Sequence, residues 1–272
     1  MTSQQVTTTD NQIPAFLKAH EGPTGTEGLG KDDLTLPRIK LGQGTSQEVK
    51  DAEVKYGDLF LNITKTALVG QGQPIEVVVL ARSKEFILWR PRKDGGGILN
   101  RARPVQTKEG VRYQWETPNE TYNVKLDGKT PVTWEVGQYV DEDGTDEWGS
   151  ENPDDPKSGK AATVHYNYVV ALPEHGNVIA AFSLSRTSVK VAKVWNSLIA
   201  MLPGVPVWGR KFAIKSVIET KNDDEFQNLS VVGAGYVSEE AFPQYDSLAK
   251  TFAEQSYSVE DQSDEAAKDE RV

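Results

Sequence analysis

Residues 75–90, IEVVVLARSKEFILWR, decide how this chain folds. Residues 75–82 and 85–90 are both rich in β-branched and aromatic side chains, a composition typical of β-strands. Only Ser83 and Lys84 separate the two runs. The stretch therefore predicts either a tight β-hairpin or one bent strand, and in both cases a β-rich fold.

Strand-like patterns continue on both sides of this stretch. They cover residues 58–65, 98–103, 111–116, 163–172, 178–184, 207–220 and 226–236. Between Thr187 and Leu202 the apolar residues fall at helical spacing instead, and residues 238–252 carry a second helical pattern with Pro243 in its first turn. These elements predict an α+β fold: an antiparallel, OB-fold-like β-barrel with long insertions, one central helix and one C-terminal helix. A β-sandwich is the alternative architecture.

The chain divides into a folded body and polar ends. Residues 1–33 are rich in Thr, Gln and Gly and predict a flexible N-terminal arm, and residues 256–272 predict a disordered acidic tail. The patterned residues between them predict a single OB-like domain over residues 34–255, with a polar, acidic excursion at residues 117–160.

The composition excludes several kinds of site. The chain has no cysteine, which excludes disulfides and thiolate zinc sites. Its three histidines, at positions 20, 165 and 175, lack the spacing of a metal chelate, so we expect no metal and no other cofactor. No apolar run approaches the roughly 18 residues of a membrane span, and the first residues lack the features of a secretion signal. We therefore expect a cytoplasmic protein with no membrane partner.

Charge is sorted along the chain. Residues 82–115 contain nine lysines and arginines against three acids, and residues 186–215 contain six basic residues and no acid. Residues 141–155 contain eight acids and no basic residue, and residues 260–272 contain six acids against two basic residues. The formal charge of −10 therefore describes a mildly basic body with acidic appendages.

The basic stretches also carry aromatic residues. This combination suits a flexible polyanion with exposed bases, because cations neutralise phosphates while rings stack on bases. The candidate stacking rings are Phe86, Trp89, Tyr113, Trp115 and Trp208. The candidate phosphate contacts are Arg90, Arg92, Lys93, Arg101, Arg103, Arg112, Arg186, Lys190, Lys193, Arg210 and Lys211. We expect one face of residues 85–90 to be core and the other to be a binding platform. The alternative is that the rings are core and the cations are a solvated face.

The sequence DGGG at residues 94–97 has two interpretations, a phosphate loop and a hairpin turn. It lacks a Gly-Lys-Ser/Thr ending and a helix directly after it, so the hairpin turn is favoured. Asp94 is also the only acid well placed beside the basic stretch. A nuclease is therefore disfavoured, and we expect no catalytic residues.

Residues 84–100, KEFILWRPRKDGGGILN, together with LPRIKL at residues 36–41, resemble proteins of phage replication and recombination modules. The predicted barrel with basic and aromatic residues and an acidic C-terminal tail resembles phage-encoded single-stranded DNA-binding proteins. The resemblance implies a non-enzymatic, sequence-tolerant protein that coats and protects single-stranded DNA in replication or recombination. It also implies replication or recombination proteins as partners of the tail, although the tail ends on Glu270-Arg271-Val272, with Val272 as its only apolar terminal residue.

Two other classes of protein stay open. A virion or scaffold-type structural protein would use the basic and acidic patches to assemble into a homo-oligomer. An inhibitor that mimics DNA would need a rigid acidic face, which the glycine- and proline-containing acidic stretches do not favour.

Overall fold

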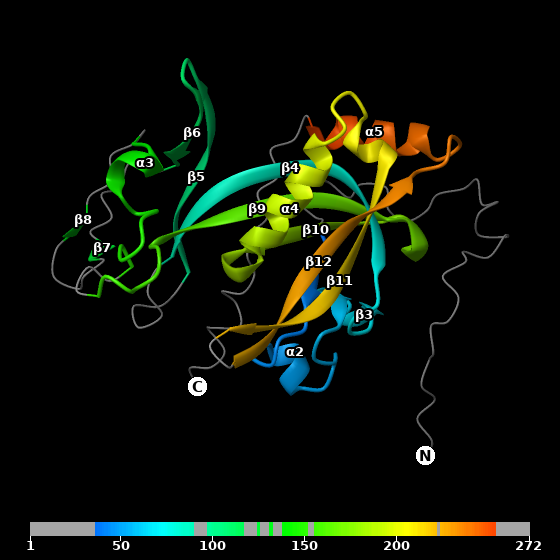
Figure 1. The fold of residues 1–272 in the computed structure, drawn as a ribbon, viewed down its shortest axis with the longest axis horizontal. Coiled ribbons are helices and arrows are strands. Elements are labelled where there is room, and N and C mark those ends of the chain that lie inside the picture. Colours follow the sequence, from blue (N-terminus) through cyan, green and yellow to red (C-terminus); the bar gives the residue numbers. More distant parts are fainter. Residues whose placement is uncertain are drawn as a thin grey trace, which may run out of the picture. The chain divides into compact units, whose positions relative to one another are not determined.

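The chain forms a mixed α+β fold whose strand pairs are almost all antiparallel (Figure 1). A computed structural model describes residues 36–89, 97–116, 124–125, 131–132, 138–151, 155–221 and 224–253. The chain divides into two compact units, each of which draws on separate stretches of sequence. Unit 1 comprises Met1–Leu80, Val169–Phe182 and Gly204–Leu248, and unit 2 comprises Ala81–Tyr168, Ser183–Pro203 and Ala249–Val272.

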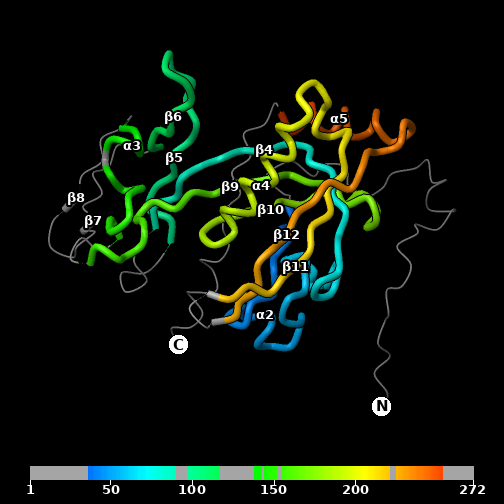
Figure 2. Tube along the Cα trace, viewed as in Figure 1, coloured from blue at the N-terminus to red at the C-terminus, as the bar shows by residue number. Residues whose placement is uncertain are grey.

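Strand β4, Ile75–Trp89, is the 15-residue segment that the sequence marks as decisive. It is one continuous strand, so of the two predicted forms the single strand is confirmed (Figure 2). Its first residues pair with β11, Arg210–Lys221, from Ile75 opposite Ile214 to Val78 opposite Lys211. Its last residues pair with β5, Ile98–Thr107, from Phe86 opposite Ala102 to Trp89 opposite Ile98.

A seven-stranded sheet contains β4. Its strand order is β10-β9-β4-β11-β12, with β5 beside β4 and β6 beside β5. The remaining strands of this sheet are β6 (Gly110–Trp115), β9 (Ala162–Leu172), β10 (Val178–Ser185) and β12 (Asp224–Tyr236). Two smaller sheets consist of β1 (Ile39–Leu41), β2 (Leu59–Leu61) and β3 (Thr66–Val69), and of β7 (Val124–Lys125) and β8 (Pro131–Val132). Within the described residues these sheets are open, so the closed barrel that the sequence analysis expected is not observed there.

Four α-helices and three 3₁₀ turns complete the described residues. The helices are α2 (Gln47–Lys50), α3 (Val140–Asp143), α4 (Val189–Ala200) and α5 (Phe242–Ala253), and the turns are η3 (Pro173–His175), η4 (Arg186–Ser188) and η5 (Val207–Gly209). Helix α4 confirms the helix predicted between residues 187 and 202. Helix α5 begins at Phe242, four residues later than predicted, and Pro243 does lie in its first turn. No helix in the described ranges is both long and apolar enough to cross a membrane.

The core of unit 1 is built around the start of β4. Val77 and Phe212 face each other across β4 and β11, and both are fully buried. Polar contacts hold the first half of α5 in this unit: the Trp208 indole donates to Asp246 at 3.0 Å, and the Tyr245 hydroxyl donates to Asn177 at 2.6 Å. These bonds connect α5 to η5 and to the turn between β9 and β10.

The core of unit 2 has two parts. One is a buried cluster composed of Leu88, Ala102, Trp115, Val140, Ala161 and Ala162. In the other, Trp195 of α4 stacks on Tyr168 of β9, with ring centroids 4.2 Å apart and planes 16° apart. Aromatic pairs of this kind contribute about 0.5–1.5 kcal/mol beyond the area that they bury. Helix α4 is thereby fixed against β9 within unit 2.

Candidate functional site

Lys84 of unit 2 lies among three aromatic rings. The Lys84 ammonium lies 5.0 Å from the ring centroid of Phe86, 4.4 Å from that of Tyr113 and 5.9 Å from that of Tyr166. Phe86 and Tyr113 meet edge to face with centroids 5.0 Å apart. We call these four residues the Lys84 cluster. They come from three strands, β4, β6 and β9.

The register of the strands explains why these side chains meet. Lys84 and Phe86 are two residues apart on β4, so strand alternation places them on one face. Phe86 pairs with Ala102 of β5, and β5 pairs in turn with β6, where Pro104 lies opposite Tyr113. All four residues of the Lys84 cluster are half-buried. A cation over half-buried rings gains about 0.5–2 kcal/mol per favourable contact.

The surroundings of the Lys84 cluster shift the pKa values of Lys84 and Tyr113. Burial lowers the pKa of Lys84, the negative charge of Asp146 opposes that shift, and the positive charge of Lys193 on α4 adds to it. Burial also raises the pKa of Tyr113, with a further contribution from Tyr166. Lys193 therefore lies close enough to Lys84 for the two charges to interact, and both belong to unit 2.

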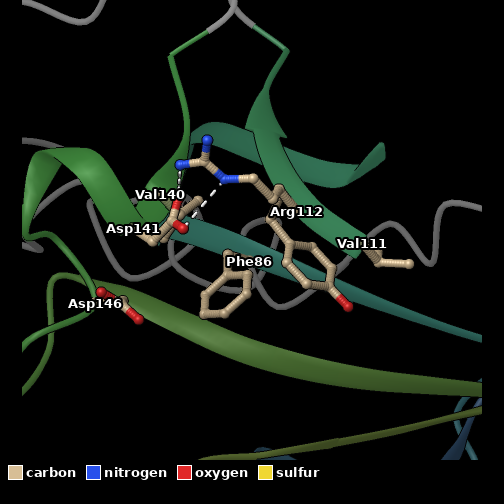
Figure 3. A pocket seen from close by; sticks show the side chains of 7 residues that line it. Phe86, Val111, Arg112, Val140, Asp141 and Asp146 are labelled. Atoms are coloured by element: carbon tan, nitrogen blue, oxygen red, sulfur yellow. Dashed lines mark hydrogen bonds and ion pairs between the residues drawn. The ribbon is translucent and has the colours of Figure 1, made fainter. Parts of the chain in front are cut away.

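A small cavity adjoins the Lys84 cluster (Figure 3). Its volume is about 90 Å³, and its lining residues are Phe86, Val111, Arg112, Tyr113, Val140, Asp141 and Asp146. Sites for drug-sized ligands usually measure roughly 300–1,000 Å³. The volume of this cavity is well below that range.

Arg112 forms one wall of the cavity and is held by two acids of α3. Its guanidinium donates to Asp141 at 2.7 and 3.2 Å and to Glu142 at 2.8 Å, and it stacks over the Tyr139 ring at 3.8 Å. Figure 3 shows the guanidinium directed at Asp141. The ion pair lowers the pKa of Asp141 and raises that of Arg112.

Most of the other predicted phosphate contacts that the structure describes also have acidic or aromatic partners. Arg101 donates to Glu85 at 3.1 Å, Arg103 pairs with Glu116, and Lys211 pairs with Glu76 at 2.7 Å. Arg210 is buried and lies over Phe212. These candidate phosphate contacts are therefore neutralised by acids that are distant in sequence or, in the case of Arg210, buried.

The predicted stacking rings differ in how deeply they are buried and in which unit they lie. Trp115 is only 2% exposed because it packs in the apolar core of unit 2, so it is not available to a base in this conformation. Trp89 and Trp208 are half-buried, and their indole N–H groups donate to Thr163 and Asp246. Trp208, Arg210 and Lys211 belong to unit 1, whereas Phe86 and Tyr113 lie together in the Lys84 cluster.

The expectation of one core face and one platform face at residues 85–90 is wrong. Ile87 and Leu88 point to opposite faces of β4, and both are buried. Phe86 is half-buried and packs against the apolar cluster of unit 2, and Lys84 is half-buried beside it. Arg90, Arg92, Lys93 and residues 94–96 lie outside the described residues, whereas Arg186, Lys190 and Lys193 are exposed on η4 and α4 of unit 2.

A chain of hydrogen bonds covers the opposite face of β4 and β9. Asn167 donates to Glu85 at 2.7 Å, and the Ser183 hydroxyl donates to Asn167 at 2.7 Å. The His165 ring lies between the Ser183 and Thr163 hydroxyls at 3.4 and 3.2 Å. This buried polar chain extends from Arg101, through Glu85, to the indole of Trp89. Buried polar groups that are satisfied in this way hold the strands in one register.

Sequence reasoning missed two residues of the site, Lys84 and Tyr166. Lys84 was counted in the basic stretch and as a separator between two strand-like runs, but not as a candidate site residue, although a single strand places it beside Phe86. Tyr166 lies in TVHYNYVVAL, where alternation puts it on the same face as Tyr168. That alternation was the available signal for Tyr166.

One known protein family matches this chain. No curated protein and no solved structure shows significant similarity to it. The family model described as "Pam3 phage gp34-like protein" matches residues 6–258, which is nearly the whole chain. The match indicates a phage protein and supports that part of the resemblance seen in the sequence. The chain therefore belongs to the Pam3 phage gp34-like protein family.

Proposed function

We propose that this protein binds single-stranded DNA with little sequence preference and coats it during phage replication or recombination. The observation that carries the proposal is the Lys84 cluster, in which half-buried rings from three strands surround an ammonium group. Rings stack on unpaired bases at about 1–3 kcal/mol per base, and cations neutralise phosphates. A surface that presents both groups together suits a strand whose bases are exposed.

Further cations of unit 2 adjoin the rings. Arg82 lies two residues before Lys84 on β4, and its guanidinium donates to Asn196 of α4 at 3.2 Å. Lys193, on the same helix, is exposed and interacts electrostatically with Lys84. Strand β4 and helix α4 therefore contribute cations to the same region of unit 2. The proposed surface is smaller than the one predicted from the sequence, because Arg101 and Arg103 are paired with acids.

Fluorescence anisotropy of a fluorescein-labelled oligo-dT, measured across a salt series, tests the proposal. For single strands, log K falls with log [salt] by about 0.7 per phosphate neutralised. We expect the slope of the variant Lys84→Ala/Lys193→Ala to be about 1.4 smaller than that of the unmodified protein, because two phosphate contacts are lost. We expect Tyr166→Leu to weaken binding about 5- to 150-fold with little change in slope, because one stacking ring is lost.

The matched control is Lys55→Ala/Lys215→Ala, which removes the same charge from two exposed lysines of unit 1. It should leave the slope near that of the unmodified protein. The proposal fails if the unmodified protein does not bind oligo-dT at low salt, which is the result that a purely structural virion or scaffold protein would give. The assignment to the Lys84 cluster fails if the two double variants lose the same slope.

A further inference from the structure

Arg112 has the geometry of a phosphate-binding residue, but carboxylates occupy the position that a phosphate would take. A guanidinium presents paired N–H donors in a plane, and it binds carboxylate and phosphate oxygens in the same manner. Here the donors engage Asp141 twice and Glu142 once, while the Tyr139 ring lies against the guanidinium face. The contact with Tyr139 is separate from the hydrogen bonds with the two acids.

The acids are much more exposed than the arginine. The side chains of Asp141 and Glu142 are 62% and 50% exposed, whereas that of Arg112 is 24% exposed. Exposed ion pairs contribute little net free energy, because water solvates the separated charges well. Asp141 and Glu142 can therefore turn into solvent at low cost, while Arg112 stays on Tyr139.

Arg112 lies where it could contact the backbone of a DNA strand whose bases stack on the rings. Arg112 lines the cavity that Phe86 and Tyr113 also line, and it is the residue next to Tyr113 on β6. The phosphate of a nucleotide whose base stacks at these rings lies within the reach of a long basic side chain beside them. The cavity and the ion pair are therefore parts of one site.

We propose that Arg112 binds a phosphodiester of single-stranded DNA, and that Asp141 and Glu142 occupy its guanidinium in the free protein as internal competitors. This inference rests on the proposed function and specifies how the same surface is regulated. Binding exchanges one ion pair for another: the phosphate takes the N–H donors of Arg112, and the two carboxylates return to water. Residues of the acidic stretch thus lower the affinity for weak ligands without blocking the rings.

The test compares Asp141→Asn/Glu142→Gln with the unmodified protein in the oligo-dT salt series. With Arg112 released, we expect binding about two- to fivefold tighter at low salt, the scale of an exposed ion pair that no longer has to be broken. We also expect the slope of log K against log [salt] to steepen by up to about 0.7, because in the unmodified protein salt weakens the competing ion pair as well as the contact between Arg112 and the phosphate.

Two further variants separate release of Arg112 from a simple loss of negative charge. Glu109→Gln/Glu147→Gln removes the same charge from two exposed positions of unit 2, and it should leave the slope unchanged. Adding Arg112→Gln to Asp141→Asn/Glu142→Gln should return the slope to that of the unmodified protein.

The inference is overturned if the steeper slope persists without Arg112, or if the control variant reproduces it. If the unmodified protein binds oligo-dT and Asp141→Asn/Glu142→Gln shows the same slope of log K against log [salt], the inference is overturned and the proposed function is not. Failure of every variant to bind oligo-dT overturns the proposed function and this inference together.

Discussion

Replacing Glu85 with alanine should be among the most destabilising single substitutions in unit 2. Glu85 is 4% exposed, and its two oxygens accept hydrogen bonds from Arg101 at 3.1 Å and from Asn167 at 2.7 Å. The substitution leaves a buried amide donor without its acceptor and a guanidinium without its counter-ion.

The cost follows from the burial of the pair. Removing one partner of a buried ion pair costs about 3–5 kcal/mol. The Arg101 side chain is 14% exposed and can turn toward water, so we expect the lower end, about 3 kcal/mol. For domains of 150–250 residues, 1 kcal/mol lowers Tm by about 2–4 °C, so the expected loss is about 6–12 °C.

Urea denaturation followed by circular dichroism measures this cost, with differential scanning calorimetry as the second readout. Glu109→Ala is the control, because Glu109 is exposed in the turn between β5 and β6, and it should change stability by less than about 0.5 kcal/mol. A double-mutant cycle with Arg101→Met should give a coupling above about 1 kcal/mol. If Glu85→Ala lowers the free energy of unfolding by less than about 1 kcal/mol, or if the coupling energy is near zero, Glu85 and Arg101 are not an energetically significant pair.

Two further predictions concern titration. Burial lowers the pKa of Lys84 below its usual value of 10.5. Between the lowered pKa and 10.5 the unfolded chain binds more protons than the folded protein, so the free energy of unfolding should rise with pH in that range. Lys84→Met should lack this rise, and a pH-independent difference between the unfolding free energies of the two proteins, measured by urea denaturation, would contradict the burial. Arg112 lowers the pKa of Asp141, so a ¹³C NMR titration should show that carboxyl returning toward 3.8 in Arg112→Gln, whereas an unchanged midpoint would show that the ion pair does not persist in solution.

Local patterns predicted the elements well because those elements depend on local properties. Runs of strand-forming residues predicted β9 and β10, and helical spacing predicted α4, which buries Val191 and Trp195. The boundary of α5 was less accurate: Ser238 accepts a backbone hydrogen bond from Phe242 across a turn that precedes the helix. A pattern that starts at a capping serine does not distinguish that turn from the first turn of the helix.

The ion pairs could not be predicted, because they depend on tertiary contacts. Glu85 and Arg101 are 16 positions apart, and Arg112 and Asp141 are 29 positions apart. The acidic stretch looked like a solvated excursion, yet two of its members neutralise a residue of the basic stretch. Sorting of charge along a sequence therefore overstates the charge separation on the folded surface.

The buried polar chain also determines where hydrogens lie around His165. The Ser183 hydroxyl donates to Asn167, so its oxygen must accept from the imidazole, and Nδ1 carries a hydrogen. The Thr163 oxygen accepts from the Trp89 indole, while its one hydrogen has a choice between Nε2 of His165 at 3.2 Å and the Ile87 carbonyl at 3.3 Å. Rotating that hydroxyl exchanges one acceptor for the other, so the chain of hydrogen bonds has two alternative arrangements at Thr163, and each of them leaves one of the two acceptors without this donor.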